Sequence, residues 1–230
     1  LHPVPDPIGD VCHHQELGYN GIFFEGAVDS WTDLIAVAYG DVGISVASNS
    51  AWITLNKTYL YGRPGHHGVV IKHSDNVLVH DFYASQDWIH HLTVTHGASG
   101  NVLKELSVLD DNGITLHLDH HRNTPFENLF SGADHQFDFK SGGDCKSGPH
   151  SGARGTFWNM QGPMSAPDWE AFQLNIIGDL GVSEQLTDDD AWYEDVNNLQ
   201  PADLHADQLT HRLNLNPPTV FSPVPIYGDR

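Results

Sequence analysis

Short alternating apolar runs recur along the chain, and their spacing restricts the folds that it can adopt. Three runs align, at residues 68–73, 91–96 and 113–118, and residues 137–140 resemble a fourth. Their starting positions lie roughly 22 to 25 residues apart, the period expected when each repeat forms one turn of a β-solenoid. A repeat of this length has no room for a crossover helix, so the pattern disfavours α/β folds with helical crossovers.

Alternation within each run predicts which side chains fill the interior, because successive residues of a strand point to opposite faces. Three coils also contain a second apolar run, which begins at Asn76, Asn101 or Asn128. Asparagine tolerates left-handed backbone, so we expect these residues at corners between strands. The sequence therefore predicts an all-β, right-handed parallel β-helix of about six to seven coils, with a short C-terminal helix.

The length of 230 residues is enough for one domain with an appendage. We expect an extended N-terminal arm in residues 1–20, the parallel β-helix in residues 21–162, and the last strands in residues 163–230, with an acidic extension and a capping helix. That helix is predicted near residues 201–213, with Asp203 as its N-cap. The N-terminal end has no such cap, and we expect an N-terminal fragment of the same precursor or a second copy to cover it.

Composition limits the partners and the compartment. Ten Lys and Arg against 30 Asp and Glu give a formal charge of −20, which opposes nucleic acid and anionic membranes as partners. No apolar run in the sequence is long enough to span a bilayer, and we expect a soluble, secreted, already processed chain. Asn56 lies in a glycosylation triplet, and whether Cys12 and Cys145 pair is left open.

Several motifs outside the apolar runs carry a family resemblance. They are HHRNTPFENLF at residues 120–130, GPHSGAR at 148–154 followed by TFWN at 156–159, and PADLHADQL at 201–209. With the repeat pattern, these resemble secreted pectin-lyase-like β-helix proteins of carbohydrate metabolism. The resemblance implies a parallel β-helix and a polysaccharide partner. It leaves the chemistry open, because that superfamily holds lyases, hydrolases, esterases and non-catalytic binders.

Cations and imidazoles gather in one part of this otherwise acidic chain, and they form the predicted site. The alignment of the runs predicts that Lys72, His117 and Lys140 share one outward file, beside Asp138. Polysaccharide lyases that act on uronates by β-elimination need a cation for the carboxylate, a base for the C5 proton and an acid for the leaving oxygen. Lys or Arg suits the first role, and His117 or His121 suits the second. The candidate catalytic residues are His117, His121, Arg122, Lys140, His150 and Arg154, and the candidate substrate-binding residues are Lys72, Asp119, His120 and Asp138.

Two alternative functions and a metal stay open. A glycoside hydrolase would need two suitably spaced carboxylates, with Asp110, Asp111, Asp119 and Asp138 available, and a non-catalytic glycan-binding solenoid is the second alternative. His67 and His90 occupy equivalent positions on neighbouring coils and should stack, so they are candidate ligands for a divalent metal, either calcium or a transition metal. No cofactor is required by any motif.

Overall fold

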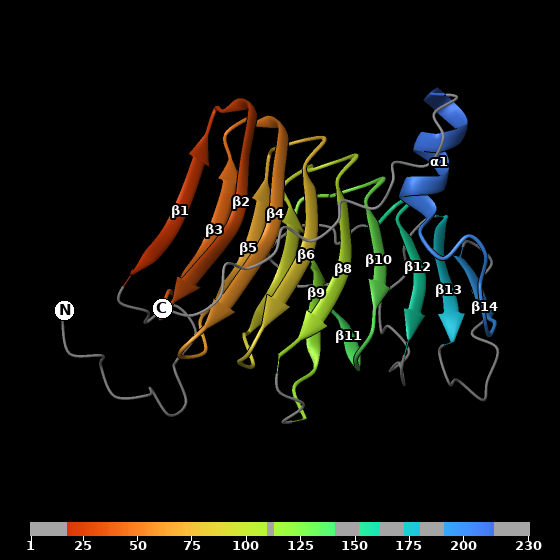
Figure 1. Cartoon of the computed structure of the whole chain (residues 1–230). Coiled ribbons are helices and arrows are strands. Elements are labelled where there is room, and N and C mark those ends of the chain that lie inside the picture. The colour runs from red at the N-terminus through yellow and green to blue at the C-terminus, as the bar shows by residue number, and fades with distance from the viewer. Residues whose placement is uncertain (1–17, 110–112, 141–151, 162–172, 180–190, 214–230) are drawn as a thin grey trace, which may run out of the picture.

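The computed structural model describes residues 18–109, 113–140, 152–161, 173–179 and 191–213. Its strands run parallel in two sheets that the chain visits in turn, which confirms the predicted parallel β-helix, with about six turns (Figure 1). Sheet A contains β1 (Asn20–Glu25), β3 (Val42–Ala47), β5 (His67–Lys72), β7 (His90–Thr95), β9 (Leu116–His120) and β11 (Phe137–Lys140).

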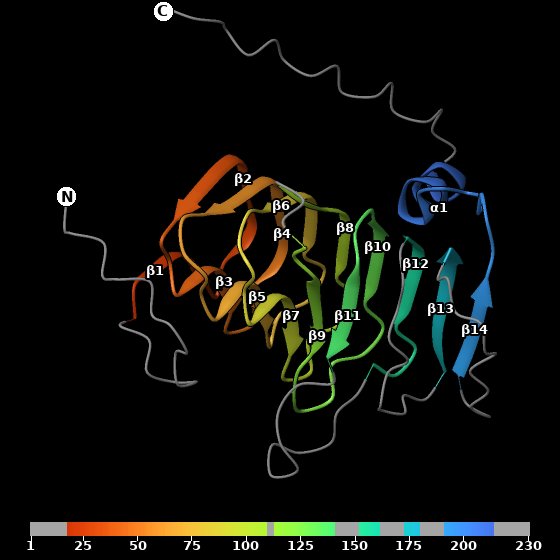
Figure 2. The ribbon, with the colours of Figure 1, turned by 90° about the horizontal axis from the view of Figure 1, so that it is seen from below.

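Sheet B lies opposite sheet A and continues beyond it toward the C-terminus (Figure 2). Its strands are β2 (Val28–Ala38), β4 (Ala51–Tyr61), β6 (Leu78–Ala84), β8 (Val102–Val108), β10 (Leu129–Ala133), β12 (Thr156–Gln161), β13 (Leu174–Asp179) and β14 (Ala191–Asp195). The one helix in the described residues is α1 (Leu204–Leu213). None of the helical structure in those ranges has the length and apolar character needed to cross a membrane.

Apolar side chains from both sheets fill the interior, as the alternation predicts. Sheet A contributes a pair of fully buried side chains from each of three coils: Ile44 and Val46, Val69 and Ile71, and Leu92 and Val94. At the first coil, Ile22 and Phe24 pack against this core. Sheet B adds larger rings toward the C-terminal coils, where Phe130 and Phe157 stack with centroids 4.9 Å apart. Equivalent residues of successive coils thus form continuous files along the axis.

The third repeat lies four residues later than the sequence alignment predicts. Leu118, not Ile114, pairs with Leu92, and Asp119 pairs with Thr93. An offset of four residues keeps the same side chains inside, so alternation alone could not reveal it. His117 is consequently not in the same file as Lys72, whose partner in the next coil is Thr95.

The three asparagines do not share one role. Asn76 has a positive φ of 55° and lies at an exposed corner, as predicted. Asn101 and Asn128 also lie between strands, directly before β8 and β10, but they are one position further along, lack the positive φ and are buried. There the Asn101 amide Nδ2 donates to Asn128 Oδ1 at 2.9 Å and to the carbonyl of Ser74 at 3.3 Å. These two residues form a buried amide ladder that satisfies backbone groups of neighbouring coils.

One corner repeats through the whole described solenoid with left-handed backbone. Isolated bridges link equivalent residues of successive coils, namely Ala51, Asp75, Ser99, Phe126 and Ala153. The residue after each of these has a positive φ, so the left-handed residues also occupy equivalent positions. Only one member of this set is glycine, so contacts between coils, rather than glycine freedom, impose the conformation at a cost of about 1 kcal/mol per residue. The members are Asp29, Trp52, Asn76, Gly100, Glu127, Arg154 and Gln173, with φ between 50° and 62°.

The two ends of the stack differ. The first coil exposes large apolar side chains, with Trp31 at 74% and Phe23 at 57% exposure. A covering partner at this end stays a prediction. On the C-terminal side, Asp203 caps α1 by accepting from the Ala206 amide at 2.9 Å, and it contacts Lys104 at 2.6 Å on β8, four strands from the β14 end of sheet B. The segment that enters α1 therefore lies against the outer face of sheet B. Residues 1–17, which hold Cys12, and residue Cys145 lie outside the described ranges.

We expect Asn101→Ala to lower the free energy of unfolding by about 2–4 kcal/mol, because it leaves the Val77 amide and the Ser74 carbonyl buried without this partner. Asn76→Gly is the control, since glycine adopts the same left-handed backbone and the side chain is exposed. Denaturant unfolding of both variants measures the difference. Equal stability of the two would contradict the amide ladder.

Candidate functional site

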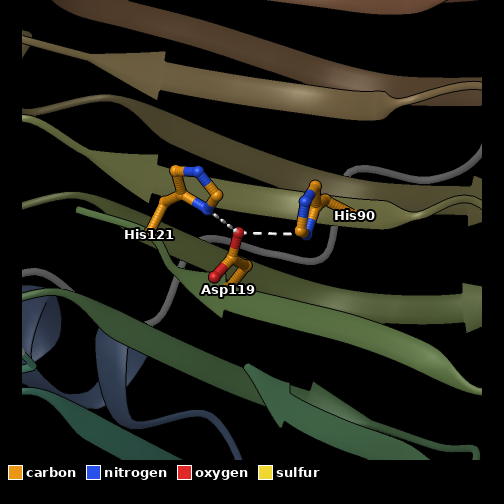
Figure 3. A group of neighbouring side chains, drawn as sticks. All are labelled: His90, Asp119 and His121. Atoms are coloured by element: carbon orange, nitrogen blue, oxygen red, sulfur yellow. Dashed lines mark hydrogen bonds and ion pairs between the residues drawn. The ribbon is translucent and has the colours of Figure 1, made fainter. Parts of the chain in front are cut away.

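A buried carboxylate lies between two imidazoles on the outward side of sheet A (Figure 3). Asp119 Oδ2 lies 2.9 Å from His121 Nδ1 and 3.1 Å from His90 Nδ1. Asp119 is 0% exposed, and the His121 side chain is 12% exposed, so the pair opens toward solvent only at His121. The three ligand atoms lie within 4.8 Å of one another.

The strands β7 and β9 hold this group in place. Leu118 and His120 point into the interior, so Asp119 between them points outward, opposite Thr93 of β7. His121 follows at the end of β9, where its amide donates to the Val94 carbonyl at 2.9 Å. Two hydrogen-bonded strands therefore fix the carboxylate and one imidazole, which limits the reorganisation needed to bind a ligand.

Further imidazoles extend the group toward the preceding coil. His67 pairs with His90 in the strand register, and their rings stack with centroids 4.9 Å apart, which confirms the predicted stack. His66 stacks on His67 at 4.4 Å, and His67 Nδ1 lies 2.9 Å from Thr93 Oγ1. We call His66, His67, His90, Asp119 and His121 the histidine cluster.

Basic side chains, two of them a Lys and an Arg, line the adjoining corner of sheet A. Lys72 ends β5 and His73 follows it. His96 follows β7, where the Arg122 carbonyl accepts from the His96 amide at 2.8 Å. The His73 and His96 rings lie 4.9 Å apart. The Nε of Arg122 is buried and meets no hydrogen-bond acceptor within the described ranges. We call Lys72, His73, His96 and Arg122 the basic strip.

Within the basic strip His96 is a neutral imidazole at physiological pH. Burial is the main cause that lowers the pKa of His96 from 6.5 to about 4, and nearby positive charge adds to it. The groups that supply this charge are Lys72, His73, Arg122 and His121. The ring is therefore unprotonated and available as a proton acceptor at pH 7, but it is a weak base, because burial and the nearby cations both disfavour its protonated form.

His117 belongs to a separate acidic group at the other end of the strands. Its Nε2 lies 3.3 Å from Asp87 and its Nδ1 lies 3.4 Å from Asp138. Its backbone amide donates to His91 Nδ1 at 3.0 Å. The structure thus brings His117 together with Asp138, as predicted, but pairs it with acids rather than with Lys72.

Other predicted residues lie apart from both groups. His120 points into the core beside Phe130 and Phe157, so it presents no surface to a substrate. Arg154 lies at the repeated corner and contacts Glu127 at 2.6 Å. The backbone of Lys140 pairs with Asp119, although nothing of its side chain is described, and His150 lies outside the described residues.

Sequence reasoning missed four residues that the structure brings to these groups: His66, His73, Asp87 and His96. A signal for two of them was present, because His73 and His96 close the aligned runs 68–73 and 91–96. Equivalent positions on neighbouring coils lie side by side, which brings these two rings together as it does those of His67 and His90. Asp87 lies in the connection between β6 and β7, where the repeat pattern does not predict which residues of neighbouring coils lie side by side.

A second set of metal-type ligands lies on sheet B. His80 Nε2 is 2.6 Å from Glu105 Oε2, and Asp81 completes the set. The hydrogen bond from His80 is the main cause that lowers the pKa of Glu105 to about 2. Asn56 holds His80 Nδ1 at 2.9 Å, and half of the Glu105 side chain is exposed.

Comparisons with protein-family models, with curated proteins and with solved structures gave no match. The structure itself shows a parallel β-helix fold. The chemistry of the three groups on sheet A, namely the histidine cluster, the basic strip and the His117 group, is therefore the guide to function.

We expect the His96 ring to titrate near pH 4 in an NMR pH titration of the chain. Replacing Lys72 by Gln removes the first of the charges that act on it, so the His96 pKa should rise in that variant and remain below 6.5 because the burial persists. Replacing Arg154 by Gln at the repeated corner should leave it unchanged. An unshifted His96 in the Lys72 variant would contradict the basic strip.

Proposed function

We propose that the chain is a secreted polysaccharide lyase of the pectin-lyase-like type that cleaves a uronate-containing glycan by β-elimination. The observation that carries the proposal is the basic strip, in which exposed Lys72 and half-buried Arg122 flank a neutral His96. Cations that bind a carboxylate next to a neutral base are what this reaction requires. The parallel β-helix supports the same class, because its coils offer a long outward face to a polymer.

Each member of the strip has one role in this proposal. The guanidinium of Arg122 and the ammonium of Lys72 bind the uronate carboxylate and stabilise the negative charge that develops at C5. His96 accepts the C5 proton. The electrons of the C–H bond form the C4–C5 double bond while the C4–O bond breaks, and water protonates the leaving oxygen.

Substrate binding also strengthens the base. The pKa of His96 is low chiefly because the ring is buried, and secondly because Lys72 and its neighbours are positive. A bound carboxylate offsets the second effect, so the proton affinity of His96 rises when the substrate is present. The formal charge of −20 repels polyanions at long range, and the strip is a local exception to it.

We expect incubation with uronate polymers to produce an unsaturated product, measured by its ultraviolet absorbance. His96→Gln should lower kcat about 10²- to 10⁴-fold, the usual contribution of a general base. Arg122→Gln should also lower kcat, because the developing charge loses a partner. Arg154→Gln is the matched control and should retain activity, since Glu127 already occupies Arg154. Full activity of both strip variants would overturn the assignment.

The pH dependence follows from the depressed pKa of His96. The base is active when unprotonated, so kcat/KM should stay constant as the pH falls from 7 to about 5 and decline near pH 4. An acid limb near pH 6.5 would instead indicate an ordinary histidine as the base. Lys72→Gln should move the limb to higher pH, in step with the NMR titration.

A glycoside hydrolase is the second candidate, and the His117 group favours it. Asp87 and Asp138 both contact this imidazole and are both accessible, at 65% and 37% exposure. Two carboxylates are the usual equipment of glycosidases. Reducing ends that appear without the ultraviolet absorbance, and that vanish in Asp138→Asn, would favour hydrolysis. Glycan binding with neither signal would favour the non-catalytic alternative.

A further inference from the structure

We propose that His90, Asp119 and His121 bind one divalent transition-metal ion, with His67 next to the bound ion. Nitrogen and oxygen ligands lie about 2.0–2.2 Å from such an ion, which places neighbouring ligand atoms about 3 Å apart. Asp119 Oδ2 lies 3.1 Å from His90 Nδ1 and 2.9 Å from His121 Nδ1. These two distances already match the spacing that one ion imposes, and all three ligand atoms lie within 4.8 Å of one another.

The ligand types select the class of metal. Calcium and magnesium take oxygen ligands, usually several carboxylates and carbonyls. Two imidazoles with one carboxylate suit zinc, iron or another first-row divalent ion. The set therefore favours the transition-metal option over calcium.

Burial and strand pairing make the set rigid. Asp119 is fully buried and His90 nearly so, and both strands that hold them are paired in register. A carboxylate taken out of water needs a compensating positive charge, and a divalent ion provides it within bonding distance. The more exposed His121 gives the ion a route from solvent.

His67 adds a third imidazole to the same place. Its ring lies 4.9 Å from the His90 ring and 6.1 Å from the His121 ring. Thr93 Oγ1 holds its Nδ1 at 2.9 Å, which fixes the ring orientation. Hydrogen bonds of this kind to the second ring nitrogen are typical of histidines beside metal sites.

The comparable set on sheet B provides a matched control. His80 Nε2 contacts Glu105 Oε2 directly at 2.6 Å, and the Glu105 side chain is 48% exposed. An exposed carboxylate is solvated and does not need a metal ion to offset burial. We therefore expect no tight binding there, although the residue types are similar.

This inference does not depend on the proposed lyase. The metal ligands belong to the histidine cluster, while the lyase roles belong to the basic strip, and His121 and Arg122 merely adjoin. Metal content and lyase activity are separate measurements, so either proposal can fail alone.

The test uses the full chain without a histidine tag, stripped of metal with a chelator and titrated with Zn²⁺ in a calorimeter. We expect one tight site per chain and a rise in the melting temperature with Zn²⁺. His121→Ala and His90→Ala should weaken binding at least about 100-fold and abolish that rise, while His80→Ala and His73→Ala should match the parent. Melting without metal identifies any variant that fails to fold.

NMR of the parent chain gives a readout that needs no variant. One equivalent of Zn²⁺ should shift the ring signals of His90 and His121 and leave those of His80 unchanged. Absence of a tight one-to-one site, shifts at His80 instead, or parent-like binding in both cluster variants would each overturn the proposal.

Discussion

Parallel pairing between successive coils is the interaction on which the rest of this structure depends. It repeats every strand about 4.8 Å from its neighbour and aligns equivalent residues into files. Like side chains therefore meet, as Tyr59 meets Tyr83 and Phe130 meets Phe157. The same alignment stacks His67 on His90, so the histidine cluster is a consequence of the repeat. Side chains of the same full charge would repel one another in such a file, whereas neutral imidazoles can stack.

The functional groups arise where this regular alignment meets one irregular coil. In the file of Val70 and Thr93, the next coil contributes Asp119, an acid where the earlier coils have uncharged residues. A lone acid in a buried position needs positive partners close by. The imidazoles of the regular coils are already within reach. The site thus combines a periodic scaffold with one non-periodic residue.

The sequence was informative where periodicity decides the outcome. Spacing and alternation predicted the parallel β-helix and the contact of His67 with His90, because every coil repeats the same constraint. They could not predict the four-residue shift that separates His117 from Lys72, since both registers bury the same alternate side chains. The predicted run also ended at Leu118, whereas β9 continues to His120, and alternation then turns this side chain inward against two rings. Such details depend on lengths of connections, which have no periodic signal.

The corner that runs from Asp29 to Gln173 has a mechanical consequence. Each of its non-glycine residues keeps an unfavourable backbone only while the adjoining coil is in place. When an end coil detaches, the next coil loses the support that held its corner closed. Loss of structure should therefore propagate like a zipper from the terminal coils, and the central coils that carry the histidine cluster would be the last to open.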